Sequence, residues 1–152
     1  MTSPPDRLSP HFRLNELTRS ATALRHGIEN RPGPEEVRNL TRLAEHILEP
    51  VRRHFAIPFS PSSGYRSARL NQLIGSQPTS QHIRGQAVDF AIPGLDNEQV
   101  AAWIKRHLTF DQLILEYHCP DEPKSGWIHC SYRIDHNRQE SLIFDGVDYR
   151  DF

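Results

Sequence analysis

Two histidines and one aspartate are of the types that can share a metal ion. His82 and Asp89 lie in the segment SQHIRGQAVD, and His129 lies further along in WIHCS. A catalytic zinc ion usually takes three protein ligands, drawn from His, Asp, Glu and Cys, and keeps one position for water. The three residues therefore form a candidate site for one zinc ion. The chemistry that such an ion supplies is the activation of water for hydrolysis.

The chain around Asp89 is suited to bring these ligands together. Gly85 precedes Asp89 and allows the tight backbone turn that convergence on one ion requires. Residues 86 to 92, QAVDFAI, predict a strand in which Ala87 and Asp89 share a face. The small side chain of Ala87 leaves room beside the site, and the residues that alternate with this pair should point into the core.

Glu116 is the candidate general base. It ends a predicted strand, and the next predicted strand carries His129. If the two strands form a hairpin centred near Glu122 and Pro123, Glu116 lies directly opposite His129, with Cβ atoms about 5 Å apart. A carboxylate that does not bind the metal but lies beside the activated water can accept its proton. The sequence therefore predicts Glu116 as a catalytic residue.

Arg66 and Ser80 are candidates for contact with a substrate. Arg66 lies in SGYRS, and its guanidinium could bind a carboxylate or stabilise a developing oxyanion. The alternative for Arg66 is a solvated position before a helix. Ser80 could form a hydrogen bond near the site or only cap a turn.

Other polar residues near these segments have simpler interpretations. His118 is the nearest rival ligand, but its position beside a loop predicts exposure to solvent. Asp111 either faces the site or caps a turn, and it is left out of the candidate site. Cys119 and Cys130 are not opposite each other in the assumed hairpin, so we expect free thiols.

The pattern of apolar residues predicts the elements that carry the site. Apolar residues recur at helical spacing from Val37 to Phe55, and Pro50 predicts a kink or break near Leu48. Two shorter helices are predicted over residues 67–74 and 97–107. Four strands are predicted over residues 86–92, 110–117, 127–133 and 140–144. Helices in the first part and strands in the second indicate an α+β domain, with a small antiparallel sheet that carries the zinc site and packs against N-terminal helices.

Length and composition limit the possible classes of protein. The chain has 152 residues, enough for a single domain over residues 1–152, and residues 1–10 are expected to form a flexible arm. The formal net charge of −1 argues against a protein that binds nucleic acid through bulk charge. No apolar run approaches the roughly 20 residues of a membrane-spanning helix, and no signal peptide is visible. We expect a monomer.

Several motifs together resemble the M15 family of zinc D-Ala-D-Ala carboxypeptidases and murein peptidases. They are SGYRS, Asn71 in the following helix, the SxHxxGxAxD pattern and the WxH pattern. The segments FRLNELTRS, LEPVRRHF and FDQLILEY resemble the compact branch found in phage lysis enzymes and cell-wall peptidases. The resemblance implies that His82, Asp89 and His129 bind zinc and that Arg66 acts in substrate binding and transition-state stabilisation. It also implies a peptidoglycan stem peptide as the substrate.

The chain departs from this resemblance at one position. Many relatives place the catalytic acid three residues before the last histidine, where this chain has Gly126. Another residue must therefore serve as the catalytic acid, and Glu116 is the best candidate. The bond that is cut stays open between the D-Ala-D-Ala bond of a carboxypeptidase and a bond such as L-Ala-D-Glu.

Two other hypotheses compete with a peptidase. The same residues could form a non-catalytic, zinc-stabilised module that binds the cell wall or belongs to a phage particle. A calcium site is the third hypothesis, but two imidazoles among the ligands argue against it because calcium prefers oxygen.

Overall fold

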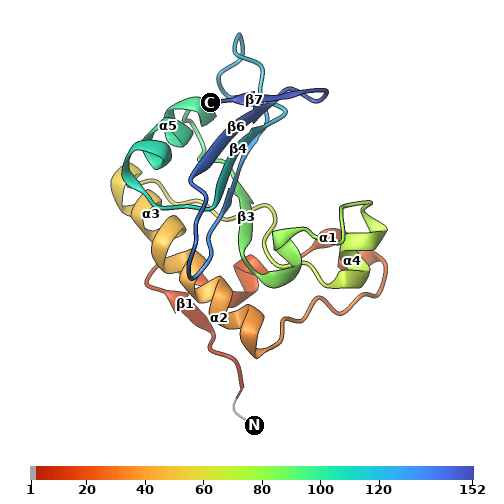
Figure 1. Cartoon of the computed structure of the whole chain (residues 1–152). Coiled ribbons are helices and arrows are strands. Elements are labelled where there is room, and N and C mark those ends of the chain that lie inside the picture. Colours follow the sequence, from red (N-terminus) through yellow and green to blue (C-terminus); the bar gives the residue numbers. More distant parts are fainter. Residues whose placement is uncertain (1–2) are drawn as a thin grey trace.

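The computed structural model describes residues 3 to 152. It combines short helical elements with a five-stranded sheet (Figure 1). The helical elements are η1 (Leu14–Leu17), α1 (Ala21–Arg25), α2 (Pro34–Leu43), η2 (Ala44–Leu48), α3 (Glu49–Phe55), α4 (Ala68–Leu73), η3 (Gln81–Arg84) and α5 (Asn97–His107). The strands are β1 (Arg7–Ser9), β2 (Phe12–Arg13), β3 (Ala87–Phe90), β4 (Gln112–Glu116), β5 (Trp127–Ser131), β6 (Glu140–Phe144) and β7 (Tyr149–Asp151).

The sheet that carries the site has the strand order β3-β5-β4-β6-β7. All neighbouring pairs are antiparallel except β4 and β6, which are parallel. The parallel pair arises because the chain leaves β5 on one side of β4 and passes to the other side before it enters β6. The α+β class is confirmed, although the sheet is mixed rather than antiparallel throughout.

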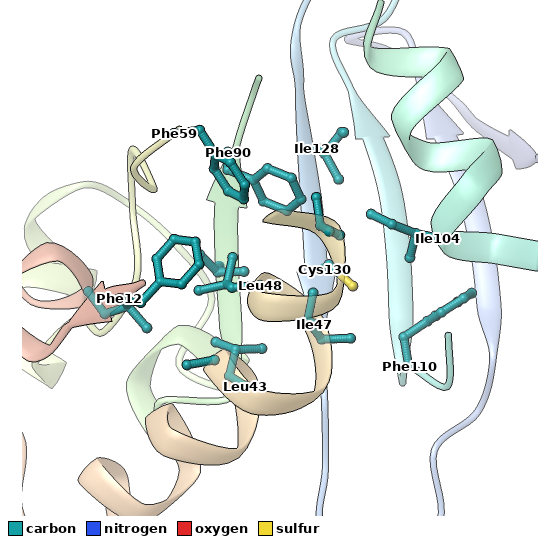
Figure 2. Packing of buried hydrophobic residues seen from close by; sticks show 14 of the residues in the cluster. Phe12, Leu43, Ile47, Leu48, Phe59, Phe90, Ile104, Phe110, Ile128 and Cys130 are labelled. Atoms are coloured by element: carbon teal, nitrogen blue, oxygen red, sulfur yellow. The ribbon is translucent and has the colours of Figure 1, made fainter. Parts of the chain in front are cut away.

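One face of this sheet is buried against helices. Val88 and Phe90 of β3 and Ile128 and Cys130 of β5 alternate with the polar residues of the site, and all four are fully buried. They pack in one cluster with residues of η2 and α5 (Figure 2). Full burial of a large aliphatic side chain stabilises a fold by roughly 1.5–3 kcal/mol. The opposite face of the sheet is left to carry Asp89 and His129.

The long helix predicted from Val37 to Phe55 continues through its proline. A π-helical turn, η2, joins α2 to α3, and Pro50 lies in the first turn of α3. Proline has no N–H to donate to the preceding turn, and a wider turn accommodates that loss. The expected break at Leu48 to Pro50 is therefore a local change of helical pitch. Ile47 and Leu48 remain fully buried.

The expectation of a flexible arm over residues 1–10 is wrong for its second half. β1 pairs with β2, and Leu8 and Phe12 join the core. The carboxylate of Glu49 in α3 accepts hydrogen bonds from the Ser9 hydroxyl and from the backbone N–H of His11. This buried polar contact fixes the hairpin on the helix, which short-range sequence patterns do not predict. The part of the expectation that concerns residues 1 and 2 lies outside the described residues.

Over residues 3–152, no helix combines the length and the apolar character that a membrane span needs.

Candidate metal centre

The structure brings His82, Asp89 and His129 together. One possible ligand atom from each lies within 4.8 Å of the other two. The Oδ1 atom of Asp89 is 3.0 Å from Nδ1 of His129 and 3.5 Å from Nε2 of His82. Asp89 on β3 and His129 on β5 are direct partners in the sheet, and His82 comes from η3 immediately before β3. The candidate ligands chosen from the sequence thus form one compact group.

The turn between His82 and β3 depends on glycine. Gly85 ends η3 with a φ of 72°, in the left-handed region. A Cβ at this position would lie 2.6 Å from the backbone oxygen of Glu36 in α2. The expected tight turn is therefore present, and contact with α2 leaves no space for a side chain. Ser80 caps the start of η3, where its hydroxyl accepts a hydrogen bond from the His82 N–H at 3.3 Å.

A backbone contact sets the orientation of the His82 ring. Its Nδ1 lies 2.7 Å from the carbonyl oxygen of Gly64. Because a carbonyl oxygen can only accept, Nδ1 carries the proton and Nε2 presents its lone pair to the cluster. This is the usual way in which proteins orient a histidine that binds metal. Burial also lowers the pKa of His82, which favours the neutral form that a ligand needs.

Asp89 is held as a carboxylate despite its burial. Burial alone would raise the pKa of Asp89, but the contacts of its carboxylate with the imidazoles of His129 and His82 outweigh it and hold the pKa well below the ordinary value. Two imidazoles and one ionised carboxylate match the ligand types of catalytic zinc, and they are not the oxygen-rich set that calcium takes. The donor set therefore fits one zinc ion.

Arg66 is fixed at the edge of this group. Its Nη2 lies 3.7 Å from Oδ2 of Asp89, and its Nε donates to the Ser63 hydroxyl at 3.3 Å. Its Nη1 donates to Oδ1 of Asn71, a buried side chain whose own amide donates to the Gln77 carbonyl at 2.9 Å. Asn71 was noticeable in the sequence only through the resemblance to a family, and the structure shows that it positions the guanidinium.

The predicted pairing of Glu116 with His129 is wrong by two residues. His129 pairs with Ile114, and Glu116 pairs with Trp127. A shift of two residues keeps the side chain on the same face, so Glu116 still lies on the face of the cluster. Diagonal neighbours of this kind lie about 7–8 Å apart, still within reach of long side chains.

Aromatic neighbours partly bury the Glu116 carboxylate. Trp127 of β5 and Phe144 of β6 are its direct partners on either side, and Phe144 stacks on Tyr149 with ring centroids 4.5 Å apart. Burial raises the pKa of Glu116, with a further contribution from the charge of Asp89, while His129 opposes the shift. A carboxylate with a raised affinity for protons, close to a metal site, is suited to accept and return a proton.

A model of the peptidase M15 family matches residues 10–131. The chain belongs to the peptidase M15 family. The match includes all three cluster residues together with Arg66 and Glu116. A comparison with curated proteins finds no match. The family resemblance seen in the motifs is thereby confirmed, whereas the family match leaves open which peptide bond this M15 chain hydrolyses.

The glycine at position 126, where the resemblance leads us to expect an acid, has a steric reason. Gly126 has a φ of 69°, and a Cβ there would lie 1.8 Å from the backbone oxygen of Glu116. No side chain, acidic or otherwise, fits at this position without a rearrangement of the loop. Glu116 thus supplies this M15 chain with an acidic residue on the face of the cluster that is not itself one of the three candidate ligands.

The rival ligand His118 is not exposed as predicted. It is buried, with Nε2 3.3 Å from Oε2 of Glu98 and Nδ1 3.2 Å from the carbonyl oxygen of Ser125. These contacts hold the loop between β4 and β5 against α5, and His118 is not part of the metal-competent group. The prediction failed because a residue at a loop boundary can still be covered by a helix from elsewhere in the chain.

Asp111 and the cysteines have structural surroundings. Asp111 accepts hydrogen bonds from Arg138 and from the side chain of Gln81, so it ties the crossing between β5 and β6 to η3. Cys119 and Cys130 are free thiols, as predicted, with Cys130 buried in the core.

Proposed function

We propose that this M15 chain is a zinc-dependent peptidase that hydrolyses a bond in the stem peptide of peptidoglycan. The observation that carries the proposal is the His82, Asp89 and His129 group, with Arg66 at one side and Glu116 on the same face of the sheet. A zinc ion bound there supplies a Lewis acid that activates water and polarises the scissile carbonyl.

Side chains of the protein transfer the proton, bind the substrate and hold the metal. Glu116 accepts the proton of the attacking water and returns it to the leaving amine, which its desolvated position and free carboxylate support. Arg66 is held by Ser63 and Asn71, so its guanidinium is preorganised to bind a substrate carboxylate or a developing oxyanion. His82 and His129 serve as ligands together with Asp89, and Ser80 contacts the substrate near the start of η3.

The experiment that tests this function is digestion of purified peptidoglycan, with the products identified by mass spectrometry. We expect the zinc-loaded chain to release stem-peptide fragments from one type of bond. Loss of the terminal D-alanine identifies a carboxypeptidase, and separation of L-Ala from D-Glu identifies an endopeptidase. A chain that retains zinc but releases no fragment from any cell-wall substrate would instead be a zinc-stabilised binding module.

A further inference from the structure

A second binding feature lies next to the metal centre. A cavity of about 550 Å³ lies between the start of α1, the segment 61–66 and the helix α4. Figure 1 shows α1 and α4 together beside the end of the sheet that carries β3. Ser63 and Arg66 line this cavity and also contact the centre, because Ser63 bridges to Asp89 and Arg66 lies 3.7 Å from its carboxylate. The cavity therefore shares two lining residues with the surroundings of the candidate ligand Asp89.

The charge of this cavity is positive, and only one of its two guanidiniums has a carboxylate partner. Two guanidiniums line it, those of Arg19 and Arg66, and no carboxylate from the described residues does. Arg66 has Asp89 as a partner, whereas Arg19 is exposed and forms no ion pair within residues 3–152. A cleft lined by one sign of charge attracts groups of the opposite sign.

The remaining lining suits a short organic acid. Hydroxyl groups from Ser20, Thr22 and Ser63 can donate hydrogen bonds, and Leu70 and Ile74 supply an apolar wall. Guanidiniums recognise carboxylates through paired N–H donors, and this geometry is more specific than a simple point charge. Hydroxyls and an apolar wall beside the guanidiniums fit an acidic amino-acid residue better than an inorganic ion.

We propose that this cavity is a substrate subsite for a carboxylate next to the scissile bond, with Arg19 as its specificity-determining residue. The inference rests on the proposed peptidase function and adds to it the charge of the preferred substrate. Arg66 contributes from the side of the metal centre, and Arg19 from the segment before α1. The carboxylate belongs either to the chain terminus of the peptide or to an acidic residue within it.

The test compares Arg19→Gln with Arg69→Gln as a matched control. Arg69 is an exposed arginine on α4 that does not line the cavity. Three synthetic stem peptides are used: one with all carboxylates free, one with a C-terminal amide, and one with its glutamate replaced by glutamine. We expect Arg19→Gln to raise KM for the free acid about tenfold, with kcat little changed, since one charged hydrogen-bonding partner is lost.

The amidated peptides identify the source of the carboxylate. If the cavity binds the C-terminal carboxylate, the wild-type chain should show the same raised KM for the C-terminal amide; if it binds the glutamate carboxylate, the raised KM should appear with the glutamine peptide. For that peptide, Arg19→Gln should not raise KM any further. Equal effects of Arg19→Gln on all three peptides, or no effect beyond that of Arg69→Gln, would overturn the subsite.

A failure of the peptidase function gives a different result. In that case the wild-type chain cleaves none of the peptides, and binding of the same peptides to the zinc-loaded chain is measured by calorimetry. Weaker binding of the free acid to Arg19→Gln than to Arg69→Gln would still support the subsite, and equal binding would reject it.

Discussion

Glu116 is the residue whose role depends most on its surroundings. Among the described residues no group donates a hydrogen bond to its carboxylate, and its direct partners in the sheet, Trp127 and Phe144, are both aromatic. Burial raises its pKa. A desolvated carboxylate without a partner destabilises the fold, so its presence is understandable if it serves catalysis.

Glu116→Gln should therefore separate activity from stability. We expect a loss of about 10²- to 10⁴-fold in kcat, the usual contribution of a general base, with thermal stability unchanged or slightly increased. Steady-state hydrolysis of a stem peptide and thermal unfolding measure the two effects. Glu122→Gln, in the exposed loop between β4 and β5, is the control and should change neither. Wild-type hydrolysis by Glu116→Gln would reject Glu116 as the base.

At the scale of elements, the β1–β2 hairpin is attached to α3 by Glu49. This side chain is 1% exposed and also lies 2.9 Å from Nδ1 of His11. Burial raises its pKa, but the hydrogen bonds from His11 and Ser9 outweigh that effect and leave the pKa below its ordinary value. A carboxyl group with a lowered pKa in the folded state stabilises the fold above the unfolded pKa, and this stability is lost as the pH falls through the folded value.

Glu49→Gln should destabilise the chain by about 1–3 kcal/mol at neutral pH, because buried donors lose a charged acceptor. The difference from wild type should shrink as the pH falls below about 4.5. Urea unfolding at several pH values measures it, and Glu45→Gln on the exposed side of η2 is the control. A difference that stays constant down to strongly acidic pH would show that the ionised carboxylate is not responsible.

The elements differed in how well local patterns predicted them. The helices at 67–74 and 97–107 and the strands that hold the ligands follow from capping residues and apolar spacing, and the structure has them close to those bounds. The register between β4 and β5 did not follow, because the loop that joins them contains an isolated bridge and a glycine that shift the pairing by two residues. The β1–β2 hairpin, the short helix α1 and the last strand β7 were missed, since all are short and depend on tertiary contacts.

The whole molecule depends on one core that joins the helices to the sheet. Ile47 of η2 is fully buried and lies in the same cluster as β3, β5 and α5 (Figure 2). Ile47→Ala should destabilise the chain by about 2–5 kcal/mol, and helix and sheet should unfold in one transition. Leu24→Ala, at an 84% exposed position, should stay within about 0.5 kcal/mol of wild type. Separate transitions for helix and sheet would contradict a shared core.

The candidate site was more predictable than the fold around it. His82, Asp89 and His129 are of the residue types that bind zinc, and alternation along one strand placed Asp89 on the correct face. The contacts that orient them come from distant segments: the Gly64 carbonyl for His82, and Asn71 for Arg66. Arg19 could not be placed from sequence at all, because its distance from the centre depends on how α1 packs near α4.

Zinc titration of the metal-free chain, with hydrolysis of a stem peptide as the readout, tests the central claim most directly. The three-residue centre predicts no hydrolysis without metal, a linear rise as zinc is added, and a plateau at one equivalent per chain. His129→Ala should remain inactive at the same zinc concentration. Full hydrolysis by the metal-free chain, or no hydrolysis after one equivalent of zinc is bound, would contradict the account.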